Sequence, residues 1–168
     1  MTNPAILTCD LCDAHRNDSD GAFRVLPPVF RSFGGRGRFA GPVATVKCHE
    51  DNTLVKAALD SPGQGRVLVV DGGGSLRRAL LGDLLAGKAV ENGWAGIVID
   101  GCVRDVAELN ACDIGFRALA LVPMPPVKRN EGQTGVPVRI QGVTVRPGDW
   151  LVADADGIVV LDRDPAAA

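Results

Sequence analysis

Arg104 and Asp105 are adjacent charged residues that could bind a small acid. They follow the apolar run Ala95–Ile99 and the pair Asp100-Gly101, so we expect a loop to expose them. An arginine guanidinium matches a carboxylate bidentately, whereas an aspartate suits Mg²⁺, which takes few protein ligands and keeps its waters. The pair could therefore bind a 2-keto acid as a metal chelate. Alternatively, Asp105 only caps the following helix while Arg104 forms a surface ion pair.

Asp83 belongs to a helix-like segment that precedes this pair, and Ser75 is the natural N-cap of that helix. Gly82 and Gly87 weaken the helix, which indicates a close backbone approach or an early end. An unpaired carboxylate close to a buried helix face is costly, so Asp83 is expected to have a partner or a function. The buried stripe of this helix is predicted to contain Leu76, Ala79, Leu80 and Leu84.

The glycine triplet Gly72–Gly74 follows the apolar run Val67–Val70 and Asp71, as in nucleotide-binding loops. The dinucleotide fingerprint fails, however, because Arg77 stands where its third glycine belongs. No Gly-Lys-Ser or Gly-Lys-Thr triplet follows, which excludes a P-loop. The backbone amides from Gly72 to Ser75 could still hold a small carboxylate or oxyanion at the start of the predicted helix.

Cys9 and Cys12 have the spacing of a zinc or redox motif, but no second pair completes a metal set. Their placement on one short helix is therefore favoured. The cysteine count is odd and no secretory segment is apparent at the start, so we expect a reducing cytoplasm. A possible anion site contains Arg31, Arg36 and Arg38. A glycine-rich loop with solvated arginines is the favoured interpretation.

The composition indicates one globular domain over residues 1–168, with mixed α and β structure. Apolar residues make up 46% of the chain, charged residues 23%, and the net charge is −2, which argues against disorder and against direct nucleic-acid binding. The 21 glycines and 11 prolines favour many turns over a helical bundle. No apolar run is long enough to span a membrane, so a soluble protein is expected.

The hydrophobic patterns place these residues in a strand-loop-helix-strand unit between Arg66 and Asp105. Ligands usually collect where parallel strands end at their carboxyl termini, so we expect the site there. Further helices are predicted at Pro4–His15, at Thr53–Leu59 with Asp51 or Asn52 as N-cap, and at Val106–Cys112. Strands are predicted at Val43–Cys48, Ala118–Val122, Val136–Ile140, Val143–Val145, Trp150–Ala153 and Ile158–Leu161, the last four as antiparallel hairpins.

Four segments in this order resemble the family named for regulator of ribonuclease activity A (RraA), which is related to class II 4-hydroxy-4-methyl-2-oxoglutarate aldolases. They are VLVVDGGGSLRRALLGDLLA, GWAGIVIDGCVRD, DIGFRALALVPMPP and VTVRPGDWLVADADGIVVL. The resemblance covers nearly the whole chain. It implies a compact α/β domain of the swivelling β/β/α type, with a central βαβ unit and C-terminal antiparallel hairpins, assembled as a homotrimer with sites between subunits.

The aldolases of this family share an aspartate, twenty intervening residues and then Arg-Asp, which Asp83 and Arg104-Asp105 match. By that resemblance, Asp83 helps to position a water, Arg104 binds the pyruvate moiety and stabilises its enolate, and Asp105 holds Mg²⁺ or Mn²⁺. The residues implied to line the substrate site are Gly82, Asp83, Leu84, Leu85 and Arg104.

Two functions follow from this resemblance. The first is a metal-dependent lyase that cleaves 4-hydroxy-4-methyl-2-oxoglutarate to pyruvate and decarboxylates oxaloacetate. The alternative is a non-catalytic regulator that binds and inhibits the endoribonuclease RNase E. Some family members have also carried a menaquinone-methyltransferase label, but the chain has no glycine-rich methyltransferase motif.

Overall fold

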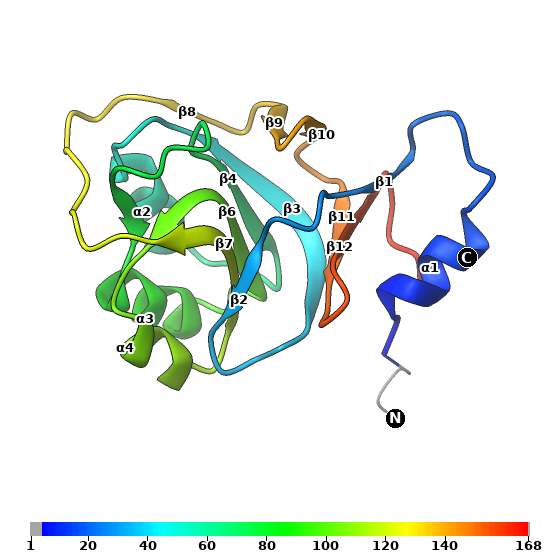
Figure 1. Cartoon of the computed structure of the whole chain (residues 1–168), viewed down its shortest axis with the longest axis horizontal. Helices are drawn as coiled ribbons and strands as arrows, with labels where there is room; N and C mark the ends of the chain where they lie inside the picture. Colours follow the sequence, from blue (N-terminus) through cyan, green and yellow to red (C-terminus); the bar gives the residue numbers. More distant parts are fainter. Residues whose placement is uncertain (1–4, 168) are drawn as a thin grey trace.

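The structure, a computed structural model, describes residues 5–167 and is built around one curled β-sheet (Figure 1). Eight of its strands follow one another along a continuous hydrogen-bonded path, while β5 (Ala79–Leu81) pairs with β6 and β8 (Gln133–Thr134) pairs with β3. In sheet order the path contains β1 (Phe23–Val25), β12 (Ile158–Leu161), β11 (Trp150–Ala153), β3 (Phe39–Lys47), β4 (Val67–Asp71), β6 (Gly96–Val103), β7 (Gly115–Leu121) and β2 (Arg31–Phe33).

The centre of the sheet consists of the parallel strands β3, β4, β6 and β7. β4 is buried along its whole length, and its side chains enter two separate cores. Leu68 and Val70 pack on the helix side, whereas Val67 and Val69 pack against a small hairpin. A strand covered on both faces reads as a continuous apolar run, which explains its sequence.

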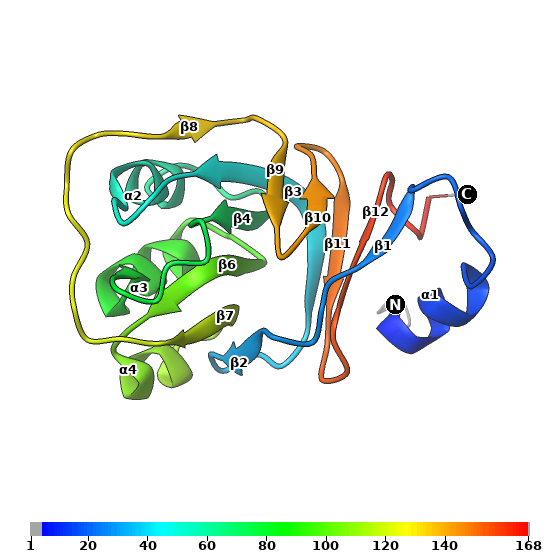
Figure 2. The same ribbon diagram turned by 45° about the horizontal axis from the view of Figure 1, so that its top comes forward.

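Three helices lie together on one side of the parallel strands, as Figure 2 shows. They are α2 (Thr53–Leu59), α3 (Asp83–Glu91) and α4 (Val106–Ala111). The hairpin on the other face is formed by β9 (Val138–Ile140) and β10 (Val143–Val145). No helix among residues 5–167 is long and apolar enough to cross a membrane.

The C-terminal strands β11 and β12 are antiparallel, and α1 (Thr8–Ala14) packs against them through Leu11. Asp154 fixes the start of this helix, because its carboxylate accepts hydrogen bonds from the amide of Thr8 at 2.8 Å and from its hydroxyl at 2.7 Å. Cys9 and Cys12 both lie on α1, as favoured from the sequence. All five cysteines are free thiols.

The predicted mixed α/β class with C-terminal antiparallel strands is confirmed, and several elements match closely. α2 has the predicted bounds, and the turn at Gln141-Gly142 joins β9 to β10 as expected. Other bounds differ: β3 begins at Phe39 instead of Val43, and β7 runs from Gly115 to Leu121. The predicted first helix begins later, at Thr8, and Pro4 lies outside the described residues.

The helix predicted to begin at Ser75 is wrong. Residues 79–81 form β5 instead, which pairs in parallel with the end of β6, and α3 begins only at Asp83. Of the predicted buried stripe, Leu76 and Leu84 are 58% and 81% exposed. A short apolar segment fits a strand as well as a helix, and pairing with β6 decides between them.

β6 extends to Val103, beyond the predicted end at Ile99. Its register against β7 shifts between Ile99 and Cys102, so the strand continues after an irregularity. Asp100 is therefore buried within the strand, where it accepts a hydrogen bond from Gln141 Nε2 at 2.7 Å. Arg104 and Asp105 follow the strand directly, at the carboxyl edge of the sheet.

Candidate active site

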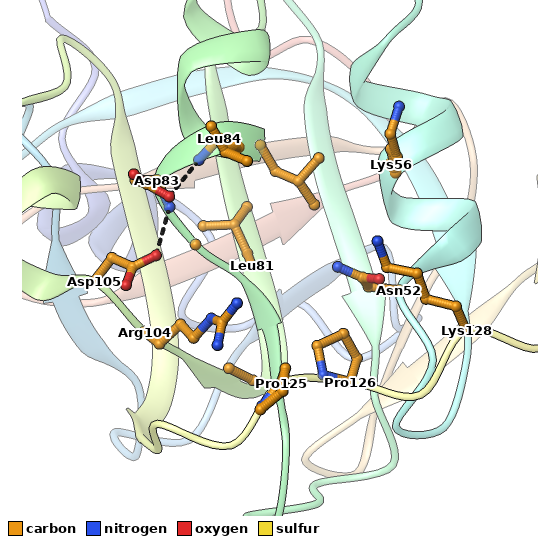
Figure 3. A pocket seen from close by; sticks show the side chains of 13 residues that line it. Asn52, Lys56, Leu81, Asp83, Leu84, Arg104, Asp105, Pro125, Pro126 and Lys128 are labelled. Atoms are coloured by element: carbon orange, nitrogen blue, oxygen red, sulfur yellow. Dashed lines mark hydrogen bonds between the residues drawn. The ribbon is translucent and has the colours of Figure 1, made fainter.

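A pocket of about 270 Å³ lies at the carboxyl ends of β5 and β6 (Figure 3). All six residues predicted for substrate or metal binding line it, although they come from two segments of the chain. Further lining residues come from α2 and its N-cap and from the segment after β7; they are Asn52, Lys56, Pro125, Pro126 and Lys128. The lining residues with predicted roles are Gly82, Asp83, Leu84, Leu85, Arg104 and Asp105.

Asp83 and Asp105 are joined by a hydrogen bond between α3 and the end of β6. The amide of Asp83, the first residue of α3, donates to Asp105 Oδ2 at 3.0 Å (Figure 3). Gly82 is the N-cap of this helix and offers no side chain, so Asp105 supplies the missing acceptor. A Cβ at position 82 would lie 2.5 Å from that same oxygen, so a larger residue here would require the Asp105 carboxylate to move.

Asp105 has a backbone conformation that a non-glycine residue rarely adopts, with φ 63° and ψ 50°. It occupies the N-cap position of α4, but its side chain makes no capping hydrogen bond to that helix. The left-handed conformation costs roughly 1–2 kcal/mol. Such strain is often retained where it positions a functional side chain, and here the carboxylate lines the pocket.

The guanidinium of Arg104 has no carboxylate partner within ion-pair distance among residues 5–167. Its Nη1 donates only to the carbonyl of Pro123, at 3.3 Å. The alternative of a surface ion pair is therefore wrong for the described residues. Since a guanidinium carries five N–H donors, Arg104 retains donors for an anionic ligand.

The side chain of Asp83 is exposed, and its Oδ1 accepts a hydrogen bond from the amide of Leu84 at 2.8 Å. The prediction that Asp83 lies close to a buried stripe is therefore wrong, because the helix begins at this residue. The two leucines that follow differ: Leu84 is 81% exposed, whereas Leu85 is 9% exposed and belongs to the core.

The predicted anion site at the glycine triplet is also wrong, since no helix begins there. The amide of Gly73 donates to Asp71 Oδ1 at 2.9 Å, and the amide of Gly74 donates to the carbonyl of Asp100 at 3.0 Å. These donors are already used. In the arginine-rich loop, the guanidinium of Arg36 donates two hydrogen bonds to the carboxylate of Asp113, so these donors are not available to an anion.

The wall formed by α2 and residues 123–129 was not predicted to take part in the site. Asp51 brings these two segments together: it accepts hydrogen bonds from the Thr53 side chain and amide and from the amides of Arg129 and Glu131. Burial raises the pKa of the Asp51 carboxyl, but these hydrogen bonds lower it by more, so the pKa is about 2. No sequence pattern links Asp51 to Arg129 and Glu131, which lie 78 and 80 positions later.

The site fits a magnesium-like ion better than zinc. Among the described residues, no three His, Cys, Asp or Glu side chains gather into a metal-binding group. Mg²⁺ needs only one or two protein carboxylates, since waters and a chelating substrate supply its other ligands. Asp105 places carboxylate oxygens that could ligate such an ion on the pocket wall, and Asp83 lies beside it.

Comparison with known proteins places the chain in a family. The family model described as "RraA-like: Aldolase/RraA" matches residues 8–160. The chain belongs to the RraA-like family. A relative from Albidiferax ferrireducens, named "Putative 4-hydroxy-4-methyl-2-oxoglutarate aldolase", is 64% identical over 165 residues, which cover 94% of this chain and 95% of the relative. A protein of the same name from Cupriavidus necator is 59% identical, covering 94% and 96%.

Two solved structures of this family share the fold under different names. The structure of "the RNA-processing inhibitor RraA" from Thermus thermophilis is 47% identical, covers 98% of each chain and has a TM-score of 0.91. A structure from Geobacillus kaustophilus, described as an S-adenosylmethionine: 2-dimethylmenaquinone methyltransferase, is 45% identical, covers 97% of this chain and 99% of its own, and has a TM-score of 0.90. The fold is therefore shared with solved relatives that carry two different names.

Proposed function

We propose that this chain is a divalent-metal-dependent lyase that cleaves 4-hydroxy-4-methyl-2-oxoglutarate and similar 2-keto acids to pyruvate. The observation that carries the proposal is Arg104, whose guanidinium lacks a carboxylate partner among the described residues and lies beside Asp105 in one pocket. The names of the relatives from Albidiferax and Cupriavidus support the same reaction.

The reaction would break the bond between C3 and C4 of the substrate. The 4-hydroxyl loses its proton, C4 becomes the carbonyl carbon of one pyruvate, and the bonding electrons form the enolate of a second pyruvate, which is then protonated at C3. Mg²⁺ or Mn²⁺ held by Asp105 would supply Lewis-acid polarisation of the 2-keto group.

In this proposal Arg104 binds the carboxylate next to the keto group and stabilises the negative charge of the enolate. Asp83 is placed to accept the proton of the 4-hydroxyl through a water, because its Oδ2 accepts no hydrogen bond among the described residues. Decarboxylation of oxaloacetate would use the same enolate, so we include it in the proposal. Gly82, Leu84 and Leu85 would form the adjacent substrate wall.

We also propose a homotrimer as the functional assembly. Short strands at the edges of the sheet, such as β1 and β2, are better protected when a neighbouring subunit covers them.

A non-catalytic regulator of RNase E is the second candidate. The observation that favours it is the close structural likeness to the RNA-processing inhibitor from Thermus. It predicts an interaction with the ribonuclease that survives substitution of Asp105. A methyltransferase is not proposed, because the chain has no glycine-rich methyltransferase motif.

The test is pyruvate release from 4-hydroxy-4-methyl-2-oxoglutarate and from oxaloacetate, with Mg²⁺ or Mn²⁺ and with EDTA. The rate of spontaneous decarboxylation with metal alone is subtracted. We expect metal-dependent turnover by the wild type and its loss in Asp105→Ala. A folded protein without turnover above the metal background would refute the lyase and favour the regulator.

A further inference from the structure

A second cavity, which we call the cleft, lies behind residues 123–129, which we call the strap. The strap belongs to the segment between β7 and β8, which crosses the carboxyl ends of the parallel strands (Figure 2). Three residues of the strap line the pocket of the candidate active site. Three others, Met124, Val127 and Arg129, line the cleft, whose volume is about 560 Å³. The strap is therefore a partition between two cavities.

Two other segments of the chain are divided between the cavities in the same way. Before α2, residues 49–51 line the cleft, whereas Asn52 lines the pocket. Before β5, Arg77 and Arg78 line the cleft, whereas β5 itself lines the pocket. The two cavities thus share their backbone walls but present different side chains, so a ligand in one can affect the other.

One carboxylate of the cleft, Glu50, is already paired. It accepts two hydrogen bonds from the guanidinium of Arg77, each at 2.7 Å, and one from the hydroxyl of Ser75 at 2.6 Å. These hydrogen bonds, that of Arg77 most of all, lower the pKa of Glu50 to about 2. Glu50 is therefore ionised at neutral pH, and Arg77 balances its charge.

Two arginines of the cleft remain without a carboxylate partner. The other acidic residue, Asp51, is buried, and its oxygens accept hydrogen bonds from Thr53 and from backbone amides. Arg78 donates through Nη1 to the carbonyl of Pro125 at 2.9 Å and keeps further N–H donors. Neither Arg78 nor Arg129 forms an ion pair within residues 5–167. The cleft therefore carries positive charge that an anion can neutralise.

The lining of the cleft also indicates which kind of anion fits. A guanidinium binds a carboxylate through two parallel hydrogen bonds, and the two arginines come from different segments. Met124, which is 51% exposed, and Val127 add apolar surface that a carbon chain can contact. A short carbon chain with several carboxylates matches both features.

We propose that the cleft is a second ligand site, separate from the pocket, which binds a short-chain polycarboxylate between Arg78 and Arg129. The bound anion joins the strap to the loop before β5 and restricts the movement of the strap. The strap contains Pro123, whose carbonyl accepts a hydrogen bond from Arg104, so occupancy of the cleft is transmitted to the pocket. The binding does not depend on the proposed lyase function.

The first test is calorimetry of the full chain with propane-1,2,3-tricarboxylate, in EDTA without metal, so that no ion at Asp105 contributes. Propionate and inorganic phosphate, at equal ionic strength, are the comparison ligands. We expect the tricarboxylate to bind about tenfold more tightly than either, as one additional charge-assisted contact would give. Its affinity should fall as the ionic strength increases. Equal or tighter binding of inorganic phosphate would refute an organic ligand.

Substitutions locate the site. Arg78→Gln and Arg129→Gln should each weaken tricarboxylate binding about tenfold, and glutamine keeps one donor at each position. Two control variants should bind as the wild type does: Arg104→Gln, which lies in the pocket, and Arg36→Gln, which pairs with a carboxylate elsewhere. Absence of binding by the wild type would overturn the inference. Binding that depends on Arg104 instead of Arg78 and Arg129 would also overturn it.

The second test measures the strap itself by amide hydrogen exchange. The amide of Val127 donates to the carbonyl of Glu50, and that of Arg129 to Asp51, each at 2.8 Å. Saturation with the tricarboxylate should slow the exchange of both amides about tenfold, and leave that of Trp94, outside the strap, unchanged. Unchanged exchange in the strap would refute transmission to the pocket. Since neither metal nor keto acid is present, failure of the lyase proposal leaves these results unaffected.

Discussion

The two walls of the pocket are built in different ways. On one wall, the amide of Asp83 donates to Asp105 Oδ2, and Gly82 lies against the same oxygen. On the other wall, Lys128 contacts no charged partner among the described residues, and its position depends on Asp51 behind it. The first wall has a fixed geometry, and the second has an anchored strap with a free side chain.

This difference suggests a division of labour. Bond cleavage needs groups held within a fraction of an ångström, which the first wall can provide. The strap of the second wall also borders the cleft, so it can respond to a ligand there. Substitutions on the first wall should therefore affect catalysis, whereas those on the second should act mainly on the strap and the cleft.

Arg104→Ala is expected to have the largest effect. Loss of a donor that stabilises the enolate should lower kcat/KM by about 100- to 1000-fold for every substrate. Arg104→Lys should recover only part of this, since an ammonium lacks the guanidinium fork. Steady-state kinetics of pyruvate release test this, with Arg36→Ala as the control because its side chain pairs with Asp113 instead. An equal loss in Arg36→Ala would contradict this role of Arg104.

Gly82→Ala should have the next largest effect, because the new Cβ would meet Asp105 Oδ2 at 2.5 Å and displace that carboxylate. We expect kcat to fall by about 10- to 100-fold with all substrates. Gly87→Ala is a matched control in the same helix, where a Cβ meets nothing within 4 Å. That variant should retain activity and gain about 0.4–1 kcal/mol in stability. Similar kinetics for the two variants would argue against a fixed geometry of the first wall.

Asp51→Asn should have the smallest effect on activity and act mainly on the second wall. Its native pKa of about 2 lies below the ordinary value of 3.8, so the ionised carboxylate stabilises the fold above about pH 4. This contribution, about 2 kcal/mol, is lost as the pH falls from 4 toward 2. Thermal melting of wild type and Asp51→Asn should therefore differ at pH 6 and converge near pH 2.

The same variant should speed the exchange of the amide hydrogens of Arg129 and Glu131 by about tenfold, since the strap loses part of its anchor. Pyruvate release should slow less than in Gly82→Ala. Asp60→Asn, which removes an exposed partner of Lys56, serves as the control. A loss of activity as large as that of Gly82→Ala would show that the two walls are not independent.

The residues of the first wall could be predicted from the sequence, because they lie in two short segments with a recognisable spacing. Gly82–Leu85 and Arg104-Asp105 could be named before the structure was known, although the reason given for Asp83, its burial, was wrong. The second wall could not be predicted from the sequence, because Asp51 joins α2 to residues 129 and 131 by accepting hydrogen bonds from their backbone amides. Amide donors are the same in every residue type except proline, so they leave no pattern in a sequence.

The main error in the predicted fold, a helix beginning at Ser75, also arises from a contact that the sequence pattern does not show. Ala79–Leu81 is apolar in a way that suits a helix or a buried strand, and only its pairing with the end of β6 makes it a strand. β4, by contrast, was predictable because a strand covered on both faces must be apolar throughout. Long-range pairing was the information that the sequence pattern lacked.

The most direct test of the account is the exchange of pyruvate methyl protons with deuterium, measured by NMR with Mg²⁺ for the wild type and for Asp105→Asn. Asparagine keeps an oxygen acceptor for the amide of Asp83 but lacks the charge that a metal ion requires. We expect metal-dependent exchange by the wild type and loss of exchange in the variant, with an unchanged melting temperature. Equal exchange by the two proteins, or none by the folded wild type, would contradict the account.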